Sequence, residues 1–375
     1  MVQLKESKTV CFGYFTLNIM DFPKTLGKLK VAIDKELGYH FDNVIRDARK
    51  KDMLIADVLK QAKKITLAGG KRIRGALLCQ AYFGAGGKEK KKILKVAAAI
   101  ELVHLFLLIH DDIIDRGSLR HGEKTLHTMF SGKKQKNISS DKASHFGDSI
   151  AIIAGDMIYA MANKLIAESG FDVLITLQAL SQIQSVAMTT IIGQSQDIAI
   201  AYKKKTTEKE VLTMYKNKTA RYTFEGPLYA GAMLAGRNNP KFLQYLSRYA
   251  VPIGIAFQIQ DDILGVFGSK KKMGKLTVSD IEEGKKSIMV VKACEWADSK
   301  QKKRLDSILG KKNLTNKEVK IFRDILKSTG ALEYSNKMAT AYFDKGKKEV
   351  KKIAFLPDAK RFLMELIKYL ENRNI

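Results

Sequence analysis

Residues 101–122, ELVHLFLLIHDDIIDRGSLRHG, place an apolar helical segment directly before three aspartates, Asp111, Asp112 and Asp115. Asp111 and Asp115 are four residues apart and share one face of a helix, whereas Asp112 is rotated by about 100° from Asp111. Gly117 follows, so the acids lie in the last turn, where the helix dipole disfavours carboxylates. A cationic partner is therefore needed, and Mg2+ binds carboxylate oxygens while leaving positions for substrate phosphates.

The same arrangement occurs a second time. Residues 252–268, PIGIAFQIQDDILGVFG, form another apolar segment that ends at an aspartate pair, Asp261 and Asp262. Two acid-ended helices can face each other across a cleft and hold divalent ions around a diphosphate. The alternative is that these acids lie in solvent and pair with nearby cations such as Arg116 and Arg120. That alternative explains one cluster but not the repeat.

The composition favours an all-α fold. Of 375 residues, 45% are hydrophobic, 28% are charged and only five are proline, and apolar residues recur at spacings of three and four. We expect a single-domain bundle of about ten or more helices around a central cavity. The spacing predicts helices over residues 24–37, 41–67, 72–84, 89–116, 145–168, 171–200, 207–236, 240–267, 279–298, 315–328 and 331–373.

Three parts of the chain depart from this pattern. Residues 1–20 are a short mixed segment that fits poorly with the rest of the chain, so we expect an N-terminal extension, with Met20 as a possible alternative start and the helical domain over residues 21–375. Residues 122–144 are polar and rich in Lys and Ser, which predicts an exposed loop. Pro227 and Pro252 fall inside apolar helical patterns and are expected to kink their helices.

The net charge of +27 would suit nucleic acid or an anionic membrane surface. The lysines are spread in short runs without interleaved aromatic residues, which favours a solvated surface and argues against nucleic acid. Three cysteines without metal-ligand spacing, and the lack of a signal peptide, predict a cytoplasmic protein. The apolar runs are interrupted before the roughly 18 residues of a membrane span, so we expect at most peripheral membrane contact.

A glycine turn provides another signal. Residues 68–75, AGGKRIRG, open a helix whose first turn carries Lys71, Arg72 and Arg74. Cations there oppose the helix dipole, so a bound anion that also takes the free backbone N–H groups would explain them. A basic turn in a basic protein is the alternative, because the spacing differs from that of the P-loop.

Further cations follow the acid clusters, as a diphosphate between the clusters would require. They are Arg120 after the first cluster and, after the second, Lys275 and Lys285; the pair Lys218 and Thr219 lies between the clusters. His104 lies seven residues before Asp111 on the same helix face, where a histidine is more often part of the core.

Taken together, these motifs resemble the trans-isoprenyl diphosphate synthases, in their archaeal geranylgeranyl diphosphate synthase-like form. The resemblance extends from about residue 23 to the end and includes GGKRIR, DDIID with Arg120, the pair Lys218 and Thr219, FQIQDD, and the following GK and EGKKS. It implies an all-α homodimer of the isoprenoid synthase type, which condenses isopentenyl diphosphate head to tail with an allylic diphosphate and requires Mg2+.

The resemblance also implies roles for individual residues. The metal ligands are Asp111, Asp115 and Asp261, with Asp112 and Asp262 completing the two clusters. The residues that hold the allylic diphosphate are Arg120, Lys218, Lys275 and Lys285. Thr219 and Gln258 lie near the developing carbocation. The residues of the isopentenyl diphosphate site are Gly70, Lys71, Arg74 and His104.

Two departures from the family pattern are visible. The family commonly has an arginine pair after the first aspartate motif, and the second member here is His121. One contact to isopentenyl diphosphate is therefore weakened or depends on pH. The second aspartate motif ends in Gly265 rather than in a third aspartate, which leaves the surroundings of a third metal ion open.

Product length should depend on how far the growing chain can extend along the cavity. Phe106 lies five residues before Asp111, about 7 Å along the helix axis, and Leu107 is next. A single aromatic residue at Phe106 resembles archaeal-type geranylgeranyl synthases, so we expect geranylgeranyl diphosphate as the main product. A farnesyl diphosphate synthase is the alternative, and a Phe106 that packs in the core away from the cavity would leave product length unexplained. A terpene cyclase would not need GGKRIR, and a non-catalytic subunit should have lost one cluster.

Overall fold

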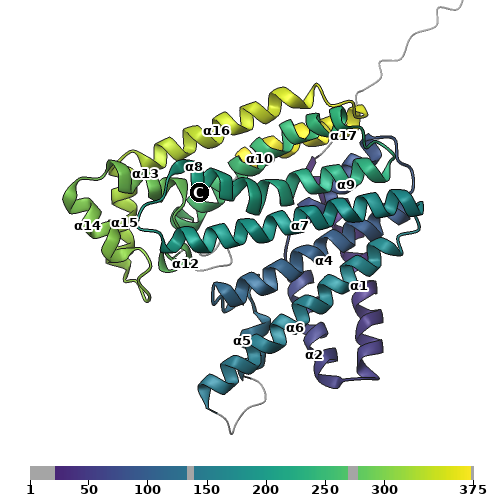
Figure 1. Cartoon of the computed structure of the whole chain (residues 1–375), viewed down its shortest axis with the longest axis horizontal. Helices are drawn as coiled ribbons and strands as arrows, with labels where there is room; N and C mark the ends of the chain where they lie inside the picture. Colours follow the sequence, from purple (N-terminus) through teal and green to yellow (C-terminus); the bar gives the residue numbers. More distant parts are fainter. Residues whose placement is uncertain (1–21, 133–138, 269–277, 373–375) are drawn as a thin grey trace, which may run out of the picture.

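The computed structural model describes residues 22–132, 139–268 and 278–372. Almost all of the secondary structure in these ranges is helical, as predicted (Figure 1). The first half contains α1 (Phe22–Arg49), α2 (Met53–Ala68), α3 (Ile73–Gly84), α4 (Lys90–Ile114), α5 (Leu126–Gly132), α6 (Ser140–Ala167) and α7 (Val173–Tyr202). A two-stranded antiparallel hairpin, β1 (Leu119–Arg120) and β2 (Glu123–Lys124), follows α4.

The second half begins with α8 (Glu208–Tyr215), a π-helix η1 (Lys216–Glu225) and α9 (Gly226–Leu234). It continues with α10 (Pro240–Phe267), α12 (Ser279–Glu282), α13 (Ile288–Trp296), α14 (Ser299–Ile308), α15 (Asn316–Ser328), α16 (Ala331–Val350) and α17 (Pro357–Glu371). Figure 1 shows α4, α6 and α7 as long, roughly aligned rods, with α16 beside α10 and the short helices α13 to α15 gathered at one end.

Three predicted helices have wrong boundaries. The helix predicted over residues 279–298 is divided into α12 and α13, because Gly284 between them has a positive φ of 73° that breaks the helix. The first helix does not end at residue 37, because Ile33, Leu37, Phe41 and Ile45 continue one buried stripe at a spacing of four. Burial of this stripe outweighs the cost of about 1 kcal/mol for a glycine such as Gly38 inside a helix. The chain breaks instead after α1, where Asp52 caps α2 by accepting a hydrogen bond from the N–H of Ile55 (3.1 Å).

The C-terminal prediction of one helix over residues 331–373 is also wrong, because Pro357 begins a separate helix, α17. α14 was not predicted, although Asp298 and Gln301 form a capping box at its start. α5 and the first turns of α6 lie within the segment that was predicted to be a loop.

The prolines have different effects. Pro252 lies inside α10, which runs without interruption from Pro240 to Phe267. Pro227 follows η1, a π-helix whose backbone hydrogen bonds span five residues instead of four. At its end, the N–H of Gly226 donates to the carbonyl of Arg221. The expected disturbance at Pro227 therefore takes the form of a π-helix, an element that often marks functional sites.

Three helices contradict the prediction that the apolar runs are too short for a membrane span. α4, α6 and α10 are long and apolar enough by length and composition, with 72%, 50% and 56% of their most apolar windows buried inside the protein. α4 and α6 pack in one core cluster with α1 and α2, whereas α10 packs with α16 and α17 in another. Their apolar side chains thus form the cores that surround the cavity.

Candidate active site

A cavity of about 1160 Å³ lies between α4, α7, η1 and α10. Both predicted acid clusters reach it, because Asp111 at the end of α4 and Asp261 near the end of α10 line its wall. The two clusters, far apart in sequence, thus belong to one site.

In the first cluster, the three carboxylates have different partners. Asp111 accepts a hydrogen bond from the amide of Gln194 (2.8 Å), and Asp115 lies 3.4 Å from the Nζ of Lys285. Asp112 is buried, and both of its oxygens accept hydrogen bonds from the guanidinium of Arg120 at 2.5–3.0 Å. Arg120 therefore engages the cluster itself, and Asp112 fixes its position.

In the second cluster, Asp262 has uncharged partners. Its Oδ2 accepts a hydrogen bond from the hydroxyl of Tyr215, and its Oδ1 accepts one from the amide of Gln258 (2.8 Å). Burial raises the pKa of Asp262 to about 7, although these hydrogen bonds act in the opposite direction. Asp261 has the position in this cluster that Asp111 has in the first, on the cavity wall.

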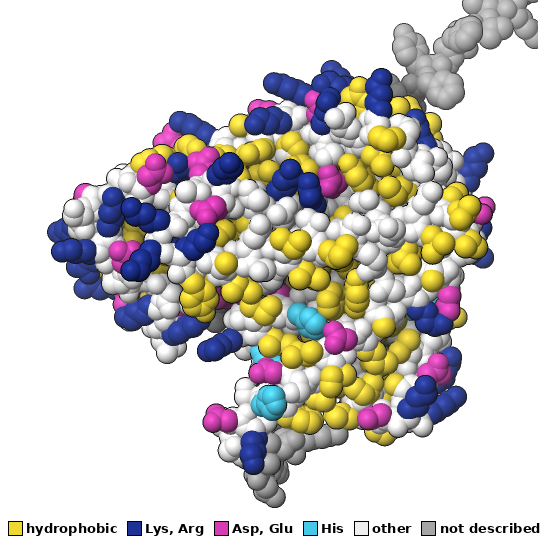
Figure 2. Space-filling model, in the orientation of Figure 1, with side chains coloured by type: hydrophobic (Ala, Val, Ile, Leu, Met, Phe, Trp, Pro, Cys, Tyr) yellow, Lys and Arg dark blue, Asp and Glu magenta, His cyan; other side chains and the backbone are white. Residues whose placement is uncertain are grey.

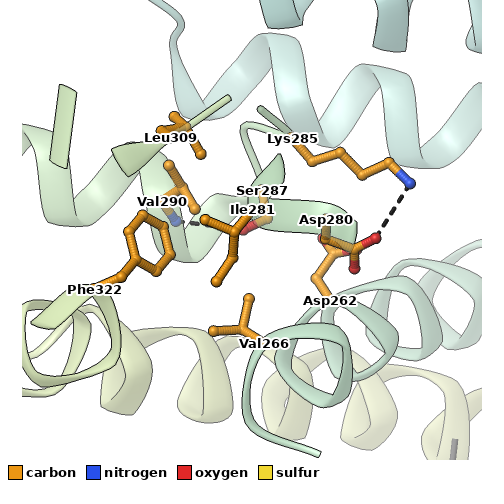
Figure 3. A pocket seen from close by; sticks show the side chains of 9 residues that line it. All are labelled: Asp262, Val266, Asp280, Ile281, Lys285, Ser287, Val290, Leu309 and Phe322. Carbon is orange, nitrogen blue, oxygen red and sulfur yellow. Dashed lines mark hydrogen bonds and ion pairs between the residues drawn. The ribbon is translucent and has the colours of Figure 1, made fainter. Parts of the chain in front are cut away.

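Gly265 provides space for another carboxylate. A Cβ at this position would lie 2.0 Å from Oδ2 of Asp280, which comes from α12. Figure 3 shows Asp280 beside Asp262, with Lys285 reaching toward Asp280 at 3.3 Å. These residues border a small cavity of about 10 Å³, the size of one water molecule. A carboxylate from another segment thus lies where the sequence pattern lacks a third aspartate.

Two of the cavity lysines, Lys218 and Lys285, are held by carboxylates. The Nζ of Lys218 lies 2.5 Å from Asp197 and 3.9 Å from Asp111. The Nζ of Lys285 lies between Asp115, Asp280 and Glu283, so it links the ends of α4 and α12. Burial lowers the pKa of Lys218 and of Lys285, but the carboxylates raise both above the ordinary value overall. Both lysines therefore remain charged and face the cavity.

The donor set fits a magnesium ion. Asp111, Asp115 and Asp261 offer carboxylate oxygens, the ligands that Mg2+ prefers. Within the described ranges, no three His, Cys, Asp or Glu side chains lie close enough together to hold a metal ion by themselves. Mg2+ usually binds one or two carboxylates together with substrate phosphates and waters.

Uncharged polar groups also line the cavity. The hydroxyl of Thr219 on η1 donates a hydrogen bond to Oε1 of Gln258 on α10 (2.6 Å), and both residues line the cavity. The wide turn of η1 brings Lys218 and Thr219 to the same wall. Cationic and neutral groups therefore lie side by side in the cavity.

The glycine turn contributes a second group of cavity residues. Gly70 has a positive φ of 88°, and Lys71 and Arg74 line the cavity together with His104 and His121. Burial and the neighbouring Arg74 lower the pKa of His104 well below its ordinary value, so its imidazole is neutral. These five residues thus lie together at the cavity, although His104 and His121 flank the first acid cluster in sequence and the other three come from the glycine turn.

Arg72 differs from the other cations of the turn. Its side chain is buried and pairs with Asp34 (2.6 Å) and Glu101 (3.9 Å). The interpretation of Arg72 as a cation that needs a bound anion is therefore wrong, because acids of the protein neutralise it. For Lys71, which is exposed, and for Arg74, whose buried Nε has no hydrogen-bond partner within the described residues, the bound anion stays a prediction.

The proposed product-length residues also line the cavity. Phe106, with 8% of its surface exposed, and Leu107 both lie on the wall formed by α4. Lys275 lies outside the described residues, so its predicted role stays a prediction.

The sequence analysis missed several polar cavity residues. Among them are Asp280 beside the second cluster, and Gln194 and Asp197, which bind Asp111 and Lys218. A signal was present: Asp197 is the one charged residue among the 30 residues of α7.

Comparisons with known proteins agree with this geometry. Residues 56–326 match the family described as polyprenyl synthetase. The chain is 35% identical over 306 residues to a short chain isoprenyl diphosphate synthase of Methanocaldococcus jannaschii, which covers 81% of this chain and 85% of the relative. It is 32% identical over 305 residues to a geranylgeranyl diphosphate synthase of Saccharolobus solfataricus, with the same shares of 81% and 85%.

The fold is similar to that of solved structures. A geranylgeranyl pyrophosphate synthase from Corynebacterium glutamicum, crystallised in complex with isoprenyl diphosphate and magnesium, has a TM-score of 0.88 and 26% identity. The match covers 93% of this chain and 99% of that one.

Proposed function

The chain belongs to the polyprenyl synthetase family, and on this premise we propose that it condenses isopentenyl diphosphate with an allylic diphosphate to form geranylgeranyl diphosphate. The observation that carries the proposal is the meeting of two acid-ended helices and two half-buried lysines at one cavity, beside uncharged polar groups. An enzyme that separates a diphosphate from a carbocation needs these two environments next to each other.

The residues on the acidic side would hold the allylic diphosphate. Asp111, Asp115 and Asp261 would bind magnesium, which supplies neutralising charge for the diphosphate as it departs. Lys218 and Lys285 would donate hydrogen bonds to the diphosphate oxygens, since both ammonium groups remain charged. Because carboxylates of the protein hold these lysines in advance, little reorganisation is needed when substrate binds.

The uncharged residues would face the cation. Oε1 of Gln258 accepts the hydrogen bond of Thr219 and presents its negative dipole end near the cavity. Such dipoles stabilise a carbocation without offering a charge that would trap it. Loss of a proton from the condensed intermediate completes the reaction.

The glycine turn would bind isopentenyl diphosphate. Lys71 and Arg74 provide positive charge, and neutral His104 has a buried Nδ1 without a hydrogen-bond partner among the described residues. This second anion site distinguishes a chain-elongating synthase from a terpene cyclase, which needs only one diphosphate. A non-catalytic subunit is not favoured either, because both acid clusters reach the cavity.

Product length would be set by Phe106, whose side chain lines the cavity about 7 Å along the axis of α4 from Asp111. Farnesyl diphosphate remains the second candidate product. We expect Phe106→Ala to lengthen the products, because it removes the floor of the space for the prenyl tail. If the ring served only as core packing, the change would cost about 3–5 kcal/mol of stability with the same products.

A homodimer is supported by the surface of α6 and α7. These helices expose large apolar side chains, among them Ile152, Ile153, Met188 and Ile192. Figure 2 shows this apolar band, with Lys and Arg concentrated elsewhere, notably at the end formed by α13 to α15. Two copies of a chain with a net charge of +27 repel each other least where both faces are uncharged. We propose a cytoplasmic enzyme, as the family implies.

The direct test is an assay with purified protein, Mg2+, labelled isopentenyl diphosphate and allylic primers of ten and fifteen carbons. Incorporation into a twenty-carbon prenyl diphosphate is expected, and chelation of Mg2+ should abolish it reversibly. Incorporation that stops at fifteen carbons would indicate the farnesyl synthase, and conversion of the primer to a cyclic hydrocarbon without isopentenyl diphosphate would indicate the cyclase.

A further inference from the structure

The floor residue Phe106 is held by two aromatic rings. The ring centroid of Tyr159 on α6 lies 4.6 Å from that of Phe106, and the ring of His110 lies 4.8 Å away in an edge-on contact. His110 and Phe106 line the cavity, whereas Tyr159 is not part of its wall. Phe106 therefore lies between the cavity and Tyr159.

Both supporting rings are tied to one face of α6. Ile152, Asp156 and Tyr159 follow each other at spacings of four and three, so they share that face. The Nε2 of His110 lies 3.3 Å from the carbonyl oxygen of Ile152 and 3.8 Å from the carboxylate of Asp156. Gly155 makes the close approach possible, because a Cβ there would lie 2.3 Å from Nε2 of His110.

Tyr159 is fixed in turn by a polar network. Its hydroxyl donates a hydrogen bond to Oε1 of Gln184 on α7, and the amide of Gln184 donates to Oδ1 of Asn163 on α6 (2.6 Å). Apolar side chains would be enough to fill the space between α6 and α7. A hydrogen-bonded network, in contrast, specifies one arrangement of its side chains. The network joins α6 to α7 directly behind the floor.

We infer that Tyr159, anchored by Gln184 and Asn163, is a positioning residue for product length that acts by keeping the Phe106 ring across the end of the prenyl-tail space. The inference rests on the proposed function, in which Phe106 is the floor. A phenylalanine on a helix can change its χ1 and χ2 rotamers when space allows. With Tyr159 anchored on one side and His110 on the other, the ring cannot move aside to admit another five-carbon unit.

The test is Tyr159→Phe, which keeps the ring and removes only the hydroxyl. We expect a larger share of products longer than twenty carbons. Their ratio to the twenty-carbon product should rise about fivefold, which is the factor that corresponds to the net free energy of one hydrogen bond. Gln184→Leu should act similarly. Gln184→Glu keeps an oxygen acceptor for the tyrosine hydroxyl, so this variant should have the parental product ratio.

The matched control is Tyr334→Phe. The Tyr334 hydroxyl also donates one hydrogen bond, to Glu208 (2.9 Å), on a part of the protein away from the cavity. This variant should keep the parental product ratio. A double variant tests whether Tyr159 acts through Phe106 or on the prenyl tail directly. Adding Tyr159→Phe to Phe106→Ala should leave the product ratio of Phe106→Ala unchanged, because Tyr159 acts through the Phe106 ring.

A parental ratio in Tyr159→Phe, together with longer products in Phe106→Ala, would overturn the inference and leave the proposed function intact. The same holds if Tyr159→Phe lowers only the melting temperature. A further lengthening in the double variant would mean that Tyr159 contacts the tail itself, which also overturns the positioning role. Unchanged products in Phe106→Ala would instead remove the floor from the proposed function.

Discussion

The ends of α4 and α10 carry the same pair of aspartates but stabilise it in opposite ways. In each pair the first aspartate, Asp111 or Asp261, lines the cavity, and both oxygens of the second accept hydrogen bonds from the protein. Asp112 pairs with a guanidinium, whereas Asp262 is held by a phenol and an amide. One dipeptide thus has a charged environment in the first cluster and a neutral one in the second.

This difference shows that a repeated motif determines the position of the carboxylates but not the charge of the groups that surround them. The first cluster has its third acid, Asp115, in its own helix, while the second receives Asp280 from α12 across Gly265. Lys285 lies at 3.4 Å from Asp115 and 3.3 Å from Asp280, so one cation connects the two clusters. The surrounding elements therefore determine how each cluster is balanced.

The largest expected effect tests whether the two clusters are equivalent in function. Asp111→Ala and Asp261→Ala should each lower kcat by about 10³-fold or more, because each removes a metal ligand that stabilises the departing diphosphate. Circular dichroism should show an unchanged helical fold. Asp324→Ala, at an exposed position on α15, is the control. Activity near the parental level in either variant would contradict the metal role of that cluster.

The second prediction tests the difference between the partners. Asp112→Asn leaves the guanidinium of Arg120, whose side chain is 19% exposed, without its counter-charge, so we expect a loss of about 3–5 kcal/mol in the free energy of unfolding. Asp262→Asn can still accept from Gln258 through its Oδ1, and its Nδ2 can donate to the Tyr215 hydroxyl in place of accepting from it, so this change should cost about 1 kcal/mol or less. Denaturant unfolding of both variants gives the comparison. Equal losses would mean that the partner's charge does not matter.

The third prediction tests whether the acid clusters serve only the allylic substrate, and the glycine turn the other substrate. Lys71→Ala should raise the KM for isopentenyl diphosphate about tenfold or more, the cost of one hydrogen bond to a charged group. The KM for the allylic substrate should stay within about twofold of the parent, because the acid clusters are untouched. Lys91→Ala, an exposed lysine on α4, serves as the control. Equal effects on both substrates would show that the two sites are misassigned.

The smallest expected effect concerns His121, next to Arg120. Burial, followed by the charges of Arg120 and Arg72, lowers the pKa of His121, so its imidazole is neutral at pH 7 and becomes a cation only at acidic pH. We therefore expect the KM for isopentenyl diphosphate to fall as pH decreases toward this pKa. His121→Arg should remove that pH dependence and lower the KM at about pH 8 by about two- to fivefold. The same pH profile in parent and variant would exclude His121 from this site.

The sequence alone determined the all-α fold, because apolar spacings of three and four reflect the helical period directly. It also identified the two acid-ended helices and the glycine turn, since each motif is short and its chemistry is local. Sequence reasoning placed the break after the first helix incorrectly, because burial of Leu37 and Phe41 against other helices decided where the helix continues. Propensity cannot report a contact that forms only on packing.

Only the tertiary structure decided which groups surround each motif. It made Arg72 a buried partner of Asp34 and Glu101, brought Asp280 beside Asp262, and turned residues 216–225 into a π-helix. The neighbours of a side chain come from segments tens to more than a hundred residues away, so their charge and distance are not encoded in the local pattern. The sequence therefore specified which chemical groups the site contains, and the packing of the helices specified how they are paired.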